Sequence, residues 1–259
     1  MLNKEQILAH WVADLYDQEE TETADVALLL DTIGPTPQNV LEVCCGSGRI
    51  LIPLAHAGHT VTGFDKQEAM LKRLEAKAKG VPRLSFFKMD AVTGDWGRGF
   101  DTVVLAGNIL INIETPMPDK QAQELFIQKA ATCLRQGGRL YLDFELHANP
   151  QEIFTLHHER IIFQGTDDMG VRGKCSLLEG VYDPATQMYR GKGRKELTLP
   201  SGETIMEKTS SLKHIPTLND VTGWLHSNGF SVLSSYGDYG RHPIGSNTYR
   251  GILYAEKAK

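Results

Sequence analysis

Apolar residues near the start of the chain recur at the spacing of a helix. Five of them lie within about three turns: Ile7, Leu8, Trp11, Val12 and Leu15. A second apolar run covers residues 26–30. Because this period places apolar side chains on one face, it favours helices that pack against a core. The pattern predicts helical structure over residues 4–33, which ends at the turn-forming residues 34–37.

From residue 40 to residue 146, short apolar runs alternate with segments of helical period. We expect strands over residues 40–45, 60–65, 84–90, 100–107 and 139–146. We expect helices over residues 49–57, 67–79 and 119–136, the last of which stops at Gly137 and Gly138. Strands that alternate with helices predict a parallel sheet covered by helices on both faces.

After about residue 150 the pattern changes to strand-like runs joined by turn residues. The runs cover residues 159–164, 172–182, 188–199 and 204–214, and Asp, Gly and Pro mark the turns between them. They predict an antiparallel β excursion. A helix over residues 218–227 and two strands over residues 230–239 and 248–256 complete the chain.

Composition and charge restrict the class of protein. The formal net charge of -5 argues against a nucleic-acid partner, because such proteins normally carry a basic excess. Cys44, Cys45, Cys133 and Cys175 show no zinc-binding spacing, so we expect neither a metal site nor a disulfide framework. The polar first residues and the lack of a long apolar stretch argue against secretion and a membrane partner. We therefore predict a cytoplasmic protein.

A glycine turn lies between the first two expected strands, and the second strand ends in a carboxylate. Gly46 and Gly48 allow the backbone to turn sharply and to approach a ligand where a side chain would collide. Asp65 follows about 20 residues later, where a carboxylate can accept hydrogen bonds from a ribose diol. Together these features predict a pocket for an adenosine cofactor.

The turn discriminates between classes of adenosine cofactor. Dinucleotide folds use the pattern G-x-G-x-x-G, whose third glycine brings the first helix close to the sheet. That third position is Leu51 when counted from Gly46, and Arg49 when counted from Cys44. The pattern fails in both registers, which disfavours a nicotinamide-dependent reductase.

Residues 42–48, Glu-Val-Cys-Cys-Gly-Ser-Gly, resemble motif I of the class I S-adenosylmethionine (SAM) methyltransferases. This motif usually reads acidic-x-Gly-x-Gly-x-Gly, so Cys44 stands where the first glycine is usual, and we expect this small residue to be accommodated. The resemblance implies SAM as cofactor and S-adenosylhomocysteine (SAH) as product. It also implies that Glu42 faces the cationic aminoacyl end of SAM, a place where it would repel a pyrophosphate.

The order of the expected elements is similar to that of the same family. It implies an α/β fold with a Rossmann-like seven-stranded sheet, an antiparallel last strand and an inserted antiparallel β subdomain. The insertion resembles the small-molecule branch, which includes glycine/sarcosine and aminosugar N-methyltransferases. We expect four parts: an N-terminal helical lid at residues 1–36, the SAM-binding core at 37–150, the β subdomain at 151–215 and the completion of the core at 216–259.

The resemblance also implies further cofactor contacts. Asp65 would hold the ribose hydroxyls, with Lys66 and Met70 beside the adenosine. Asp90 and Ala91 would meet the adenine edge, and the alternative for Asp90 is a cap on the turn that follows it. The methionine moiety would lie against the end of the fourth strand, from Ala106 to Asn108. Arg49 opens the first helix of the core and either joins this set or pairs with a surface carboxylate.

The loop after the fourth strand bears on the acceptor. Enzymes that methylate amide or nucleobase nitrogens carry an Asn/Asp-Pro-Pro-aromatic motif here, whereas this chain has Gly-Asn-Ile-Leu-Ile-Asn at residues 107–112. We therefore expect a small-molecule acceptor with a nitrogen or oxygen nucleophile. The alternative is a regulatory protein that binds SAM without turnover, because no catalytic residue is assured by sequence.

Candidates for a general base lie at the end of the fifth strand, where open α/β sheets place their ligands. Asp143, Glu145 and His147 alternate there and share one face. Tyr16 is a candidate for a lid over SAM and acceptor, although core packing explains its helix equally well. The β subdomain either shapes the acceptor site or forms the contact of a homodimer, since its strands offer edges for pairing.

Overall fold

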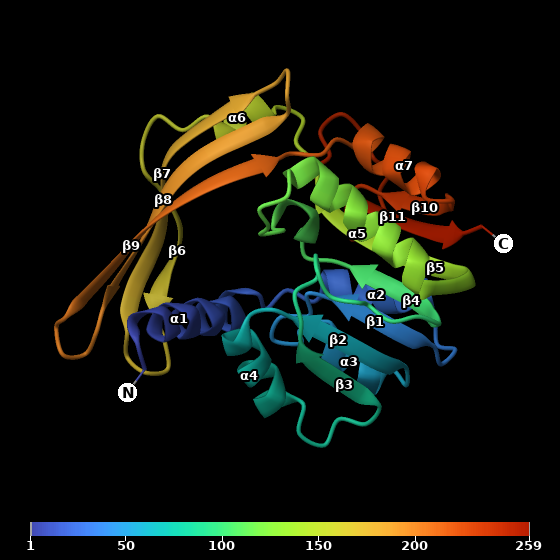
Figure 1. The fold of residues 1–259 in the computed structure, drawn as a ribbon, viewed down its shortest axis with the longest axis horizontal. Helices are drawn as coiled ribbons and strands as arrows, with labels where there is room; N and C mark the ends of the chain where they lie inside the picture. The colour runs from blue at the N-terminus through green and yellow to red at the C-terminus, as the bar shows by residue number, and fades with distance from the viewer. Residues whose placement is uncertain (1, 259) are drawn as a thin grey trace. The chain divides into compact units, whose positions relative to one another are not determined.

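The computed structural model describes residues 2–258, which form two compact units (Figure 1). The core unit contains Glu22–Ala148 and the chain from Pro216 onward. The β unit contains the chain up to Thr21 together with Asn149–Ile215. The expected lid at residues 1–36 is thus divided: its first helix belongs to the β unit and its second to the core unit.

The core unit is built on a seven-stranded sheet in the order β10-β11-β5-β4-β1-β2-β3. Its strands are β1 (Asn39–Val43), β2 (Thr60–Asp65), β3 (Leu84–Lys88), β4 (Phe100–Leu105), β5 (Leu134–Glu145), β10 (Phe230–Tyr236) and β11 (Arg250–Lys257). Strands β1 to β5 are parallel, and β11 runs antiparallel between β5 and β10. The predicted Rossmann-like sheet with an antiparallel last strand is confirmed.

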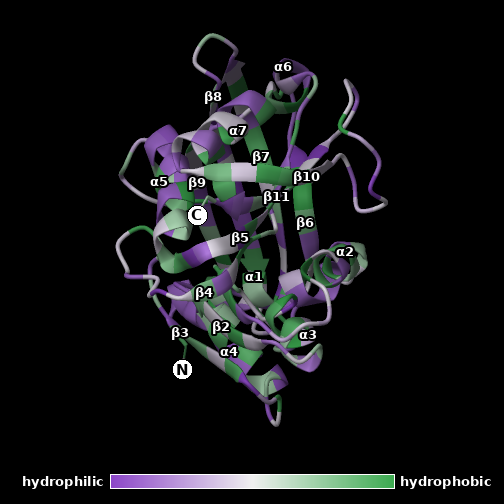
Figure 2. Cartoon of the chain, turned by 90° about the vertical axis from the view of Figure 1, so that its right-hand side faces the viewer, coloured by the Kyte–Doolittle hydropathy of each residue, from purple (hydrophilic) through white to green (hydrophobic). Residues whose placement is uncertain are grey.

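Helices cover both faces of this sheet because its central strands are apolar on both sides. Val40, Val104 and Tyr141 are buried in one cluster with α2 (Ala24–Ile33), α3 (Leu51–His56) and α4 (Glu68–Lys77). Leu41 and Val103 lie in the other cluster, with α5 (Asp119–Cys133) and α7 (Leu218–Ser227). Figure 2 shows α2 and α3 coloured mostly as hydrophobic, as expected for helices buried against a sheet.

The β unit is a four-stranded antiparallel sheet in the order β6-β7-β8-β9. Its elements are α1 (Lys4–Glu19), α6 (Pro150–Phe154), β6 (Arg160–Thr166), β7 (Arg172–Asp183), β8 (Met188–Thr198) and β9 (Thr204–His214). Leu8, Trp11 and Leu15 of α1 pack with apolar residues of the sheet. Two strand glycines make room for this helix, because a Cβ at Gly165 would lie 2.4 Å from Leu15 and one at Gly173 would lie 2.8 Å from Trp11.

Several predicted boundaries are wrong. Helix α5 ends at Cys133 and β5 begins at Leu134, because Leu134 pairs with Phe100 and the strand accommodates Gly137 at a φ of 67° across an irregularity. Strand β4 ends at Leu105, since Gly107 and Asn108 are left-handed. The helical region at residues 4–33 is interrupted after Glu19. No helix within residues 2–258 combines the length and apolarity needed to cross a membrane.

Candidate cofactor site

The loop after β1 has a backbone that favours glycine. Cys44, Gly46 and Gly48 have φ values of 57°, 53° and 84°. A Cβ at Gly48 would lie only 2.3 Å from Leu74 Cδ1, so this position needs glycine for space as well as for conformation. Cys44 is accommodated in the left-handed conformation, at a cost of about 1–2 kcal/mol. The left-handed backbone at Cys44 explains why glycine is usual at this position of the motif.

Asp65 connects the end of β2 to the loop after β1. Its Oδ2 accepts the Gly46 N–H at 3.0 Å, and its Oδ1 accepts the Gln67 N–H at 2.7 Å. Burial raises the pKa of this carboxyl, and the backbone hydrogen bonds act in the opposite direction. Each carboxylate oxygen can accept a second hydrogen bond. Asp65 therefore fixes the loop and still has the capacity to accept from a ribose diol.

Glu42 is the buried acid of the loop. It is 5% exposed, and its Oε2 has no hydrogen-bond partner among residues 2–258. Burial raises its pKa to about 8, while Arg49 lowers it. A buried acceptor without a donor is costly, which makes such a group a candidate ligand contact. In its ionised form, this carboxyl group matches the ammonium that the aminoacyl end of SAM carries.

Arg49 pairs with a carboxylate of the protein. Its Nη1 lies 2.7 Å from Asp25 Oδ2, and it also donates to the Glu22 carbonyl at 3.3 Å. Asp25, on α2, is buried rather than on the surface, and no sequence pattern identified it. Of the two roles predicted for Arg49, the structure therefore shows the ion pair with a carboxylate rather than a cofactor contact. This pair places a positive charge near Glu42 and connects α2 to the start of α3.

The predicted adenosine contacts have partners within the protein. Asp90 Oδ1 accepts the backbone N–H groups of Val92 and Thr93 at 2.8 and 3.1 Å, so the predicted turn cap is present. The carbonyl oxygen of the buried Ala91 accepts a hydrogen bond from Trp96 Nε1–H at 2.9 Å. Lys66 forms a partly exposed ion pair with Glu114 at 2.7 Å. Met70 lies half-buried on α4.

The ends of β4 and β5 are connected by Asn108. Its Oδ1 accepts the Glu145 N–H at 3.1 Å, and its backbone is left-handed, with a φ of 61°. Ala106, two residues earlier, is half-buried. Glu145 Oε2 in turn lies 3.6 Å from His147 Nε2. Burial lowers the pKa of the His147 imidazole, and Glu145 partly opposes this effect. The sequence prediction that Glu145 and His147 lie together agrees with these distances.

Asp143 has a different environment from Glu145. It is 1% exposed and receives hydrogen bonds from Arg250 Nη1 at 2.5 Å and from the Tyr239 hydroxyl at 2.7 Å. Burial raises its pKa, and Arg250 and Tyr239 lower it. Arg250 belongs to β11, so its role depends on pairing between strands distant in sequence and had no signal in the sequence pattern. Asp143 is a partner of the C-terminal segment rather than an available base.

Tyr16 lies half-buried on α1 in the β unit. The other predicted site residues belong to the core unit: Glu42, Cys44, Gly46, Gly48, Arg49, Asp65, Lys66, Met70, Asp90, Ala91, Ala106, Asn108, Glu145 and His147. The place of Tyr16 beside a cofactor stays a prediction.

Comparison with known proteins bears on this site directly. Residues 40–138 match the family described as "Methyltransferase domain". Glycine N-methyltransferase of Rattus norvegicus is 30% identical over 114 residues, which are 40% of this chain and 39% of that protein. A putative methyltransferase of Geobacillus sp. (strain WCH70) is 24% identical over 85% of both chains. The chain thus spans about two fifths of the length of the rat protein.

Solved structures match over nearly the whole chain. The CcbJ methyltransferase from Streptomyces caelestis has a TM-score of 0.73 at 19% identity, over 97% of this chain and 98% of that one. SAM-bound CalS10 from Micromonospora echinaspora has a TM-score of 0.65 at 17% identity, over 95% and 97%. At these identities the likeness shows the fold. Over residues 40–138 the chain is thus similar to a methyltransferase domain, and its fold is the one that these solved methyltransferases share.

Proposed function

We propose that this protein is an enzyme that transfers the methyl group of SAM to a nitrogen or oxygen of a small molecule and releases SAH. The observation that carries the proposal is Glu42, a buried carboxylate with an oxygen that lacks a donor, next to a loop whose Gly48 has no space for a side chain. A cationic, phosphate-free adenosine cofactor satisfies both features. A dinucleotide would bring a negatively charged pyrophosphate to this carboxylate.

In this proposal, different residues of the core unit bind different parts of the cofactor. Glu42 accepts from the ammonium, Asp65 from the ribose hydroxyls, and the second oxygen of Asp90 from the adenine amino group. Cys44, Gly46, Ala91, Ala106 and Asn108 supply backbone surface, while Lys66 and Met70 flank the adenosine. Arg49 holds the loop through Asp25 rather than the cofactor. SAM supplies an electrophilic methyl group, and alignment and exclusion of water provide most of the rate acceleration.

Glu145 and His147 are the proposed acid–base pair at the mouth of the sheet. Burial lowers the pKa of His147 and so favours its neutral imidazole, which can accept the proton that an amine or hydroxyl acceptor loses during methyl transfer. Glu145, 3.6 Å away, stabilises the imidazolium that results. Tyr16 is proposed as part of a lid over the acceptor.

The proposed acceptor is a small amine or alcohol. Support comes from relatives whose names state such acceptors, namely glycine N-methyltransferase, the amino pentose methyltransferase CalS10 and the sugar N-methyltransferase KedS8. We assign acceptor selection to the β unit, with a homodimer contact through its edge strands as the competing role. Four free cysteines accord with a reducing compartment such as the cytoplasm.

Calorimetric titration with SAM, SAH and NAD tests the cofactor, and SAH formation with glycine, sarcosine and aminosugars tests the reaction. We expect binding of SAM and SAH, no binding of NAD, and turnover with at least one amine. Binding of NAD alone would overturn the proposal. Binding of SAM without turnover on any amine or alcohol would instead indicate a SAM-binding regulatory protein.

A further inference from the structure

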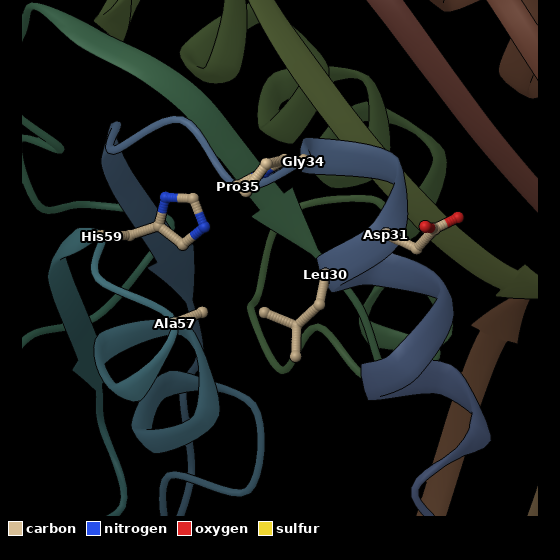
Figure 3. A pocket seen from close by; sticks show the side chains of 6 residues that line it. All are labelled: Leu30, Asp31, Gly34, Pro35, Ala57 and His59. Atoms are coloured by element: carbon tan, nitrogen blue, oxygen red, sulfur yellow. The ribbon is translucent and has the colours of Figure 1, made fainter.

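A cavity of about 320 Å³ lies at the end of the core sheet opposite to the cofactor loop (Figure 3). It is lined by Leu30, Asp31, Gly34, Pro35, Ala57 and His59. These residues come from the end of α2, the turn after it and the turn that leads into β2. The cofactor loop follows the carboxyl end of β1, whereas the cavity precedes β1 and β2, so the two sites are separate.

His59 gives this cavity a buried polar group without a partner. The residue is 0% exposed, and its Nε2 has no hydrogen-bond partner among residues 2–258. Its Nδ1 accepts the backbone N–H of Gln38 at 3.3 Å. An acceptor nitrogen carries no proton, so in the neutral imidazole the proton lies on Nε2. Burial lowers the pKa of His59, which favours this neutral form. Figure 3 shows one ring nitrogen directed toward the space beside Leu30.

The other walls define what the cavity can hold. Leu30, Pro35 and Ala57 are apolar. Asp31 supplies a carboxylate at the rim, and it pairs with Arg241. The imidazole is neutral and the carboxylate is balanced, so the cavity has no net charge that would recruit an ion. Its volume is at the lower end of the range for small-molecule sites.

We infer that this cavity is a second small-molecule site, which takes a compact, neutral, largely apolar molecule with a hydrogen-bond acceptor directed at His59 Nε2–H. The apolar body lies against Leu30, Pro35 and Ala57, and the acceptor oxygen or nitrogen reaches the buried donor when the side chains that cover Nε2 shift to admit it. A buried donor without an acceptor costs free energy, so the ligand supplies what the protein leaves unpaired. This site is independent of the cofactor and of the acceptor.

Cyclohexanone is a suitable probe, because it combines a carbonyl acceptor with a compact apolar ring. When cyclohexanone is titrated into the full chain, the backbone amide chemical shifts of Ala57 and His59 should change and saturate. The expected dissociation constant is about millimolar for so small a molecule. Protonated cyclohexylamine has the same ring but only donors, and it should bind about tenfold more weakly. Tighter binding of the ammonium would overturn the assigned ligand class.

Three variants locate the site. Ala57→Leu fills the cavity from an exposed position and should abolish the changes, whereas Ala76→Leu, an equally exposed alanine on α4, should leave them intact. His59→Asn retains an acceptor for the Gln38 N–H, and its shorter amide does not reach the place of Nε2. This variant should bind the ketone about fivefold more weakly, as expected for loss of one neutral hydrogen bond. Binding that is unchanged in Ala57→Leu, or a crystal soak with only an ordered water at Nε2, would overturn the inference.

Discussion

The two units use buried carboxylates for different purposes. In the β unit, Asp167 Oδ1 accepts the N–H groups of Met169 and Val171, and Asp14 accepts the N–H of Asp168. Both carboxylates close the backbone between β6 and β7. In the core unit, Glu42 and Asp143 lie at or near the carboxyl ends of strands. Glu42 has an oxygen without a hydrogen-bond donor among residues 2–258, whereas Asp143 pairs with Arg250.

The charged pairs differ in the same way. The β unit carries exposed pairs such as Lys192–Glu179, with side chains 66% and 65% exposed, and such pairs contribute little to stability. The core unit buries Asp143 beside Arg250, and removal of one partner from such a pair leaves an uncompensated charge. The Lys192–Glu179 pair of the β unit therefore lies on a solvated sheet face, whereas the Arg250–Asp143 pair of the core unit determines local structure near the proposed site.

The largest expected effect is from the buried pair. Arg250→Met should lower the free energy of unfolding by about 3–5 kcal/mol, because it leaves Asp143 buried without its cation. Lys192→Met, the matched removal of the cation in the β unit, should cost less than about 1 kcal/mol. Urea unfolding followed by far-ultraviolet circular dichroism reports helices and strands of both units, so it measures both variants on one scale. Equal losses for both variants would remove the contrast between the units.

The next largest effect is expected at Gly48 of the cofactor loop, with Gly46 of the same loop as its control. Gly48→Ala should destabilise the protein by about 2–4 kcal/mol, from backbone conformation and from the contact with Leu74 Cδ1 at 2.3 Å. Gly46→Ala has nothing within 4 Å of the new Cβ and should cost only the conformational part, about 1–2 kcal/mol. Thermal unfolding without ligand measures both. A larger loss at Gly46 would contradict the packing explanation.

The charge of Glu42 gives a pH-dependent prediction. Its pKa is raised from 4.5 to about 8, so the folded protein binds an extra proton between these values and loses stability as the pH rises through that window. Glu42→Gln should flatten this decline. If the ammonium of SAM pairs with the carboxylate, binding at pH 7 should release a proton, detected by calorimetry in buffers of different ionisation enthalpy. The variant should bind SAM about 10- to 100-fold more weakly, without that release.

The smallest effect is expected at Cys44. Cys44→Gly should relieve the left-handed strain but add unfolded-state entropy, for a net gain of about 0.5–1 kcal/mol. SAM affinity should change less than about threefold. Thermal unfolding and calorimetry decide, and a net loss of stability would show that the Cys44 side chain packs favourably enough to outweigh its backbone conformation.

Local signals account for most of the fold. Apart from the start of β5, period-two and helical patterns located the strands of both sheets to within a few residues, because side-chain burial depends directly on that period. The main error, at α5 and β5, arose because Gly137 was interpreted as a helix stop, whereas it lies within a strand that begins at Leu134. Pairing of Leu134 with Phe100 decided that boundary, and this contact is not local.

For the site, the sequence by itself determined the cofactor loop. Glycines at 46 and 48 and an acid at 42 follow from the needs of a close backbone and a cationic ligand, and these are properties of consecutive residues. Only the tertiary structure decided that Arg49 pairs with Asp25, that Arg250 and Tyr239 hold Asp143, and that His59 lines a cavity with an unpaired donor. The burial and partner of a charged group depend on which distant elements pack beside it. The hydrophobic period of a segment does not show which other segment will pack against it.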